Sequence, residues 1–332
     1  MNIANKLLNR PRRSPSRSEL QLETDGLISI AFDPQYDSIV RDYYLYCVAI
    51  LKEELFAIEH PCNVIIGPEE FEFNNAFRTF RIIFQIEHTL VKSGGRDTAS
   101  APNGIVKVSE QGDETYLVRL VNQDALMKAD AIIDYSRPNV WNVQSCGLYP
   151  EIAEKTFPIS PLIYSPHRKT RNRSLDCITV FGDTKQPRRS AFLMRANSKT
   201  PTENINNVFS NIDEIYGDTK ILLNIHQTDH HHTVEELRIL PALLCGAVVI
   251  SEVSPLTNKL WYDEHIIWAK IEDMPDLAAW VLQNYTEVFQ KAFGLGFSRT
   301  VERLAVENQG NARKIAKYFE SQLSAPDSGR QQ

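Results

Sequence analysis

The chain has 332 residues, of which 42% are hydrophobic and 23% are charged, an ordinary globular composition with enough length for two medium cores. The formal net charge of −6 argues against a general nucleic-acid binder, although local basic clusters could still hold phosphates. No apolar run approaches ~18 residues, so no transmembrane helix is predicted. The five cysteines are scattered without a C-x-x-C spacing, which favours reduced thiols in a cytosolic protein.

The first eighteen residues form a basic tail. They contain Lys6, Arg10, Arg12, Arg13 and Arg17 and no acidic residue. We expect residues 1–18 to be disordered, and such a tail either stays solvated or contacts an anionic membrane surface. The tail lacks the apolar centre of a signal peptide. The expected location is therefore the cytoplasm, with peripheral contact at the inner face of the membrane as the alternative.

Residues 19–165 are predicted to form a first α/β domain. Short apolar, β-branched segments indicate strands at 27–32, 63–66, 81–86, 116–120 and 131–135, and residues 36–58 have the spacing of a long amphipathic helix. Residues 92–112 are rich in Gly, Ser, Asn and Asp, which predicts a long loop. That loop either contacts an acceptor or is disordered without a function.

A second α/β domain is predicted over residues 166–323, after a Pro-rich, basic linker at 158–174. Strands are expected at 177–182, near 206–209 and at 266–271. Helices are expected from Arg188 and at 275–293 and 299–323. Residues 324–332 should be a disordered tail.

Residues 220–252 predict a strand, a helix and a second buried strand in direct succession. An apolar run ends at His226, Thr233 and Glu236 fit a capping box that opens a helix, and Cys245-Gly246 is typical of its end. In a βαβ unit of this kind, ligands bind beyond the carboxyl ends of the strands, where helix N-termini attract anions. We therefore expect a binding site at His226 and in the loop that follows it.

Several motifs of this unit resemble the C-terminal domain of GT-B glycosyltransferases, in a bacterial and viral branch. The matching residues are Leu223-Asn224-Ile225-His226, Glu235, Arg238, Gly246 and Val249-Ile250-Ser251-Glu252. Three further segments occur in the order of that family, at 82–87, 129–136 and 180–182. Arg188-Arg189 follows the last of them, and the resemblance spans roughly residues 80–290.

The resemblance implies two Rossmann-like α/β domains that face a cleft, with a nucleotide-activated sugar as a substrate and no cofactor. Many retaining members of the family carry two glutamates on this helix, at positions that here hold Thr233 and Pro241. Donor contacts therefore cannot be copied from those members.

Basic residues follow the first strand of the predicted second domain. At Lys185, Arg188 and Arg189, fixed cations and a helix N-terminus could stabilise the negative charge that grows on a phosphate leaving group. Arginine can also contact phosphate oxygens with two parallel hydrogen bonds. The alternative is an exposed basic helix start. The resemblance implies that one of the two arginines faces the donor.

Two acids and an arginine near the βαβ unit are further donor-binding candidates. Glu235 and Arg238 share one helix face and could bind hydroxyls and phosphate, whereas the alternative is an intrahelical ion pair worth ~0.3–0.5 kcal/mol. Glu252 closes the next strand, where an acid can hold ribose hydroxyls. The resemblance assigns Glu252 to the donor site.

Four histidines and one aspartate lie together in the sequence at His226, Asp229, His230, His231 and His232. Imidazoles with a carboxylate can ligate zinc or iron, but the H-E-x-x-H spacing is absent and no metal is predicted. His226 ends the strand and is expected to bind donor phosphate or sugar. We expect His232 to line the cleft.

Acids at strand ends of the first domain are the candidates for the catalytic group. Glu87 and Asp134 each follow an apolar strand and would project toward the cleft. An inverting transfer needs a base, and a retaining double displacement needs a carboxylate nucleophile. The catalytic candidates are Asp134, Glu87 and His226, while capping of the following helix is the alternative for Asp134.

The sequence thus predicts a metal-independent, hexosyltransferase-like glycosyltransferase. It would act on a saccharide or lipid-linked saccharide in surface-polysaccharide assembly. Two alternatives remain open, namely a non-catalytic GT-B binding protein and a metal-dependent enzyme built on the His226–His232 loop. The nucleotide, the sugar and the stereochemical outcome are not specified by the sequence.

Overall fold

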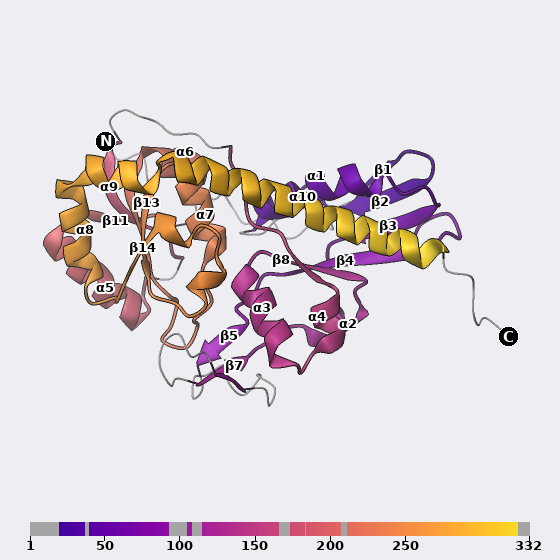
Figure 1. Cartoon of the computed structure of the whole chain (residues 1–332), viewed down its shortest axis with the longest axis horizontal. Coiled ribbons are helices and arrows are strands. Elements are labelled where there is room, and N and C mark those ends of the chain that lie inside the picture. Colours follow the sequence, from indigo (N-terminus) through magenta and orange to yellow (C-terminus); the bar gives the residue numbers. More distant parts are fainter. Residues whose placement is uncertain are drawn as a thin grey trace.

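The computed structural model describes residues 20–36, 40–92, 105–107, 115–165, 173–182, 184–206 and 211–324. Two sheets covered by helices lie side by side, and the long helix α10 runs across both (Figure 1). The expected tail at 1–18 lies outside the described residues, and so does the expected tail at 324–332 except for Ser324, which ends α10, so the structure does not test them. The same holds for most of the predicted loop at 92–112 and for residues 166–172 of the predicted linker. The described parts differ from the prediction, because residues 105–107 form a strand and Arg173 of the linker is buried.

The first sheet has six strands in the order β1-β2-β3-β4-β8-β9. The strands are β1 (Gln21–Thr24), β2 (Ile28–Phe32), β3 (Cys62–Ile66), β4 (Thr79–Gln85), β8 (Ala131–Asp134) and β9 (Thr156–Pro158). All neighbours are parallel except β1, which pairs antiparallel with β2. Every residue of β3 and β8 is buried, as expected for parallel strands that helices cover on both faces.

Helices α1 (Arg41–Leu55) and α10 (Leu295–Ser324) pack together over one face of this sheet. Helices α2 (Gln123–Lys128), α3 (Arg137–Cys146) and α4 (Pro150–Glu154) belong to a separate core cluster with Ile132 of β8. The Ser136 hydroxyl accepts from the Asn139 N–H at 3.3 Å and caps α3. Gly147, with φ of +67°, ends the helix in the left-handed conformation.

A small antiparallel sheet extends the first domain toward the second. It consists of β5 (Leu90–Lys92), β7 (Thr115–Val118) and β6 (Ile105–Lys107), in the order β5-β7-β6. Val91 of β5 forms an antiparallel bridge with His231 of the second domain. The small sheet therefore joins the two domains through backbone pairing.

The second sheet has five parallel strands in the order β11-β10-β12-β13-β14. They are β11 (Thr202–Asn204), β10 (Leu175–Thr179), β12 (Thr219–Asn224), β13 (Val248–Glu252) and β14 (Ile266–Ala269). The chain leaves β10 for β11 on one side and then crosses to β12 on the other. The direction of strand addition reverses there, and α/β sheets bind ligands in the crevice at such a reversal.

Helices cover the second sheet on both faces (Figure 1). They are α5 (Pro187–Lys199), α6 (Ile212–Asp218), α7 (Glu236–Leu244), α8 (Met274–Gln283) and α9 (Tyr285–Ala292), with 3-10 turns η4 (Thr257–Lys259) and η5 (Asp263–His265). Helix α5 packs on α8, and α6 packs on α7. The prediction of two Rossmann-like α/β domains is confirmed.

Arg173 fixes the start of the second domain. Its guanidinium is only 7% exposed and donates to the backbone oxygens of Tyr216, Thr219 and Cys245 at 2.8 to 3.0 Å. These oxygens belong to the end of α6, the start of β12 and the end of α7. One buried cation therefore ties three elements together.

Helix α10 belongs to both cores. Phe297 and Leu304 are buried in the second domain, whereas Ala312, Ile315 and Phe319 are buried in the first. The predicted boundaries place this whole helix in the second domain, but its apolar stripe continues onto α1. Its second half is therefore part of the first core.

Several predicted elements differ from those observed. The helix expected at 275–293 is divided at Asn284, whose side chain donates to the Trp280 oxygen at 2.8 Å and whose backbone is not helical. The predicted Thr233–Glu236 capping box is wrong, because α7 begins at Glu236 and the Thr233 hydroxyl accepts from the Leu90 N–H instead. A strand lies at Thr202–Asn204, while residues 207–209 of the strand expected nearby are outside the described residues.

Gly246 has φ of +80° and follows the end of α7, so the predicted left-handed end of that helix is confirmed. Among the residues that the structure describes, no helix combines the length and apolarity needed to cross a membrane.

A buried carboxyl group lies where α7 meets the first domain. Glu236 is 0% exposed, accepts from the Tyr262 hydroxyl at 2.7 Å, and lies beside Ser136 and Arg137 at the start of α3. Burial raises the pKa of Glu236 from 4.5 to about 7, although the hydrogen bond from Tyr262 opposes this. The interface between the domains thus contains a titratable group near neutral pH.

Candidate functional site

The reversal between β10 and β12 brings three predicted residues together. Arg188 lies in the first turn of α5 after β10, His226 follows β12, and Glu252 ends β13. The parallel register places the carboxyl ends of these strands at one edge. Arg188, His226 and Glu252 therefore converge although they are distant in the sequence.

Arg188 is held between two carboxylates. Its guanidinium pairs with Glu252 and with Asp229, and Nη1 donates to the His226 backbone oxygen at 3.0 Å. Burial alone would lower the pKa of Arg188, but the two carboxylates outweigh it and the pKa is raised. For Glu252, burial would raise the pKa, but His226 and Arg188 outweigh it and lower the pKa. Both groups are charged at neutral pH.

His226 is a neutral imidazole at this edge. It is 3% exposed, and burial lowers its pKa from 6.5 to about 4. Nε2 lies 3.2 Å from the Val253 oxygen, so this nitrogen carries the proton and Nδ1 is the acceptor. Among the described residues, Nδ1 has no hydrogen-bond partner. The backbone N–H of His226 donates to Glu252 at 2.9 Å.

A cavity of about 360 Å³ opens at the same edge. Its charged lining residues are three cations and three carboxylates, namely Arg188, Arg195 and Lys270 with Asp229, Glu252 and Glu272. Two of the three cations lie on α5 and the third follows β14. A phosphate group can therefore approach several cations and the N-terminus of α5 from one side.

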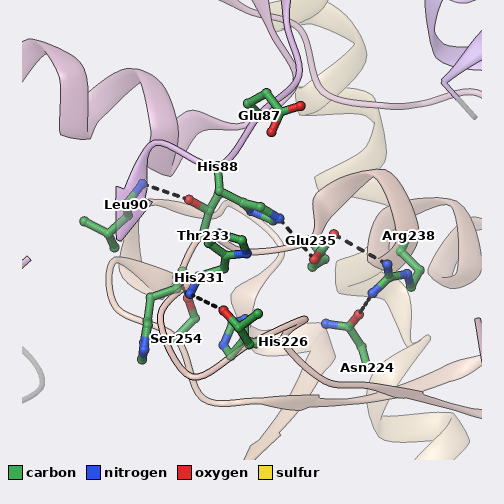
Figure 2. Close-up of polar contacts among 12 residues, drawn as sticks. Glu87, His88, Leu90, Asn224, His226, His231, Thr233, Glu235, Arg238 and Ser254 are labelled. Carbon is green, nitrogen blue, oxygen red and sulfur yellow. Dashed lines mark hydrogen bonds and ion pairs between the residues drawn. The ribbon is translucent and has the colours of Figure 1, made fainter. Parts of the chain in front are cut away.

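A second cluster of charged groups crosses from one domain to the other. His88 reaches from the first domain toward Glu235, and Arg238 and Asn224 continue the series of contacts (Figure 2). The distances are 3.4 Å from His88 Nε2 to Glu235, 3.7 Å from Glu235 to Arg238, and 2.8 Å from Arg238 to Asn224 Oδ1. Burial would raise the pKa of Glu235, but Arg238 and His88 outweigh it and lower the pKa well below its usual range. Glu235 is therefore ionised at neutral pH.

Backbone contacts hold His88 in place. The Leu90 N–H donates to the Thr233 hydroxyl at 3.1 Å, and the Leu90 oxygen accepts from His232 N at 3.1 Å. The His88 and His231 rings are stacked with centroids 5.1 Å apart. His88 is consequently fixed against the loop that carries the other histidines.

His232, Lys185 and Arg189 occupy three different positions relative to the cavity. His232 stacks on His226 with ring centroids 5.4 Å apart and donates from Nε2 to the Asp229 oxygen at 2.9 Å. Lys185 is exposed in the segment before α5 and does not line the cavity. Arg189 is 5% exposed, with its guanidinium 4.6 Å from the Phe181 ring centroid. Of the two adjacent arginines, Arg188 is the one at the cavity.

The two acids predicted as catalytic groups do not line the cavity at Arg188. Asp134 is 1% exposed and accepts from Ser136 N at 2.8 Å and Asn139 Nδ2 at 3.2 Å. Burial raises the pKa of Asp134 well above its ordinary value. Its contacts are those of a group that fixes the start of α3. The Glu87 side chain is 46% exposed and lies 3.5 Å from Arg119.

Sequence reasoning missed His88, Asn224 and Lys270. His88 follows Glu87 in the same turn after β4, so its position at the end of a strand was a usable signal. Asn224 lies within the quoted Leu223–His226 motif, but its bond to Arg238 depends on the fold. Among the residues that the structure describes, no group of three or more His, Cys, Asp or Glu side chains has the geometry of a metal site.

No family model matches the chain. Its sequence is 25% identical over 219 residues to an uncharacterized protein, R358, of Acanthamoeba polyphaga mimivirus. The match covers 62% of this chain and 75% of the viral protein.

Solved structures similar to the chain include known glycosyltransferases. An α1,3-fucosyltransferase with GDP-fucose is 11% identical, with a TM-score of 0.41 and coverage of 90% of this chain and 91% of that chain. Anabaena HepE in complex with UDP is 9% identical, with a TM-score of 0.45 and 84% coverage of both chains.

A mutant of S. aureus TarM, in complex with Fondaparinux, alpha-GlcNAc-glycerol and UDP, is 11% identical, with a TM-score of 0.48. That match covers 85% of this chain and 59% of the TarM chain, so the chain spans less than two thirds of that length.

Proposed function

We propose that the chain is a glycosyltransferase that binds a nucleotide-activated sugar at the edge formed by β10, β12 and β13. The observation that carries the proposal is the convergence of Arg188, His226 and Glu252 at the strand-order reversal, beside a polar cavity. Reversal points of parallel sheets are the usual ligand sites of this architecture. The proposal needs no cofactor and no essential metal.

Phosphate oxygens of the donor would bind at Arg188. Its partner Asp229 has a side chain that is 77% exposed, so a phosphate can replace it with little desolvation. Arg195 and Lys270 add positive charge to the same cavity. As the glycosidic bond breaks, these cations stabilise the charge that grows on the leaving phosphate. Glu252 is placed to accept hydrogen bonds from ribose hydroxyls.

His88 is the candidate base that the geometry favours over Asp134 and Glu87. Glu235 accepts from His88 Nε2–H and orients the ring, in the manner of a carboxylate-oriented histidine. Nδ1 is buried and has no hydrogen-bond partner among the described residues, so this nitrogen would take the proton once an acceptor hydroxyl reaches it. The acceptor hydroxyl would attack the anomeric carbon while its proton passes to His88 and the bond to phosphate breaks. Arg238 keeps Glu235 ionised. Asp134 would then position α3 rather than react.

The acceptor is a saccharide or a lipid-linked saccharide that approaches from the first domain, and the reaction would serve surface-polysaccharide assembly. The enzyme would act in the cytoplasm, with its basic N-terminal tail in contact with the inner face of the membrane. These parts of the proposal rest on the sequence resemblance and on the basic residues of the tail.

Nucleotide binding provides the first test. Thermal unfolding of the full chain is measured with UDP, GDP, ADP, dTDP and CMP, with and without EDTA. We expect one nucleotide to raise the midpoint temperature without metal, and Arg188→Ala to abolish this increase.

Lys199→Ala, at the far end of the same helix, is the matched control and should behave as the wild type. If no nucleotide stabilises the chain, a non-catalytic binding role replaces the transferase. Stabilisation that is lost in EDTA would favour a metal-dependent site instead.

A further inference from the structure

A second cavity lies between the domains, away from the proposed donor site. Its volume is about 540 Å³, within the range of roughly 300–1,000 Å³ that is typical of ligand sites. Four parts of the chain form its walls, namely helix α3, the segment around β9, the turn η4 and helix α10. It shares no lining residue with the cavity at Arg188. A ligand there would contact both domains and the helix that joins them.

Two tryptophans hold cations at this cavity. The Lys259 ammonium lies 4.7 Å from the centroid of the Trp141 ring. Trp261 carries Arg137 at 3.9 Å and Arg303 at 3.6 Å. Each cation is thus fixed beside an aromatic surface, where the ring attracts it without neutralising its charge.

The charges around the cavity have a positive surplus. Arg137 is paired with Glu307, so these two lining residues cancel. Lys259 and Lys314 remain among the lining residues, against the single carboxylate of Glu154. The whole chain has a net charge of −6, whereas the residues that line this cavity have a net positive charge. Electrostatics therefore favours a negatively charged ligand.

Neutral polar groups indicate that the ligand is more than a simple anion. Gln144 and Asn258 carry exposed side-chain amides in the lining of the cavity. Side-chain amides can serve hydroxyls as both donors and acceptors. The cavity is also far larger than one phosphate or sulfate ion. Phe157, Trp141 and Trp261 in the lining add apolar surface that suits the C–H faces of a pyranose ring.

We propose that this interdomain cavity binds a negatively charged saccharide, with Lys259 and Lys314 as the residues that select for charge. The carboxylate or phosphate of the sugar contacts the two ammonium groups, and its hydroxyls contact the surrounding amides. This inference uses none of the residues assigned to the donor nucleotide. It therefore stands whether or not the proposed transferase activity is correct.

The test compares matched ligands on the full chain. Quenching of tryptophan fluorescence is titrated with a hyaluronan tetrasaccharide, with neutral chitotetraose, with an acidic tetraglutamate peptide and with inorganic phosphate. We expect saturable binding of the charged saccharide, at least tenfold tighter than that of the other three probes. The double variant Lys259→Gln and Lys314→Gln should weaken it at least tenfold, because the charge contacts are lost.

Lys317→Gln is the matched control, since Lys317 is exposed on the same helix but does not line the cavity. It should bind as the wild type does, and the circular dichroism melts of all variants should agree. Arg188→Ala, which is expected to lose nucleotide binding, should keep saccharide binding. The inference is overturned by equal affinity for the neutral saccharide, the peptide or phosphate, by unchanged binding in the double variant, or by no saturable binding.

Discussion

Glu236 makes the stability of this protein depend on pH in a direction that can be calculated. Its pKa is raised from 4.5 to about 7 in the folded chain because the carboxyl group is fully buried between the domains. This difference in pKa corresponds to about 3 kcal/mol, at 1.36 kcal/mol for each tenfold change in the proton equilibrium.

The direction of this pH dependence follows from whether the folded or the unfolded chain keeps the proton on Glu236. Below pH 4.5 both the folded and the unfolded chain are protonated at Glu236, and this contribution to stability is fully present. Between 4.5 and about 7 the unfolded chain loses the proton while the folded chain retains it, so stability falls as the pH rises. Above about 7 the contribution is gone, because the folded chain then holds a buried carboxylate.

The variant Glu236→Gln isolates this effect. Glutamine keeps the shape and can still accept from Tyr262, but it never becomes charged. Its stability relative to the wild type should therefore rise by about 3 kcal/mol between pH 4.5 and pH 8. Any constant cost of burying the amide group is the same at both pH values and cancels in this comparison.

Urea unfolding at pH 4.5, 6, 7 and 8, followed by tryptophan fluorescence, measures the difference in unfolding free energy at each pH. Glu302→Gln is the control, because Glu302 is exposed on α10 and its loss should leave the pH profile unchanged. Parallel stability profiles for the wild type and Glu236→Gln would refute the reasoning.

Three further substitutions test the site and the framework. Arg188→Ala should weaken nucleotide binding by about 10- to 100-fold, since a hydrogen bond to a charged group contributes about 1.5–3 kcal/mol; isothermal titration calorimetry measures this, and unchanged affinity would remove Arg188 from the site. His88→Ala should lower kcat by about 10²- to 10³-fold with little change in the KM for the donor, as expected for loss of a general base; a proportional rise in KM with normal kcat would assign His88 to binding. Arg173→Ala should lower the unfolding free energy by about 3 kcal/mol or more, because three buried backbone oxygens lose their donor; urea unfolding checks this, and a loss below about 1 kcal/mol would contradict it.

The strands and the edge formed by β10, β12 and β13 could be predicted because they depend on local sequence. The apolar runs before His226 and Glu252 form buried parallel strands, and parallel register alone brings the ends of such strands together. Arg188 follows from the same rule, since it begins the helix after β10. Choosing it over Arg189 required the structure, because adjacent helical residues point in different directions and only their packing shows which one reaches the edge.

The contacts between the domains could not be predicted in this way. His88 and Glu235 meet only because β5 pairs with the 230–232 segment, and neither local sequence reveals that pairing. Thr233 had the sequence features of a helix cap, but a backbone N–H of the other domain uses its hydroxyl. Asp134 illustrates the same limit, because its position at a strand end fits both a cleft residue and the buried group that it is. Tertiary contacts decided each of these cases.

The crossing helix α10 limits how the two domains can move. Its first turns are anchored in one core and its last turns in the other, so the angle between the sheets cannot change unless this rod bends, slides or detaches at one end (Figure 1). Gly310 lies between the two anchored stretches, and glycine weakens a helix by about 1 kcal/mol relative to alanine. Any hinge motion between the domains would therefore concentrate its strain near Gly310, and Gly310→Ala would restrict that motion without altering a residue that lines either cavity.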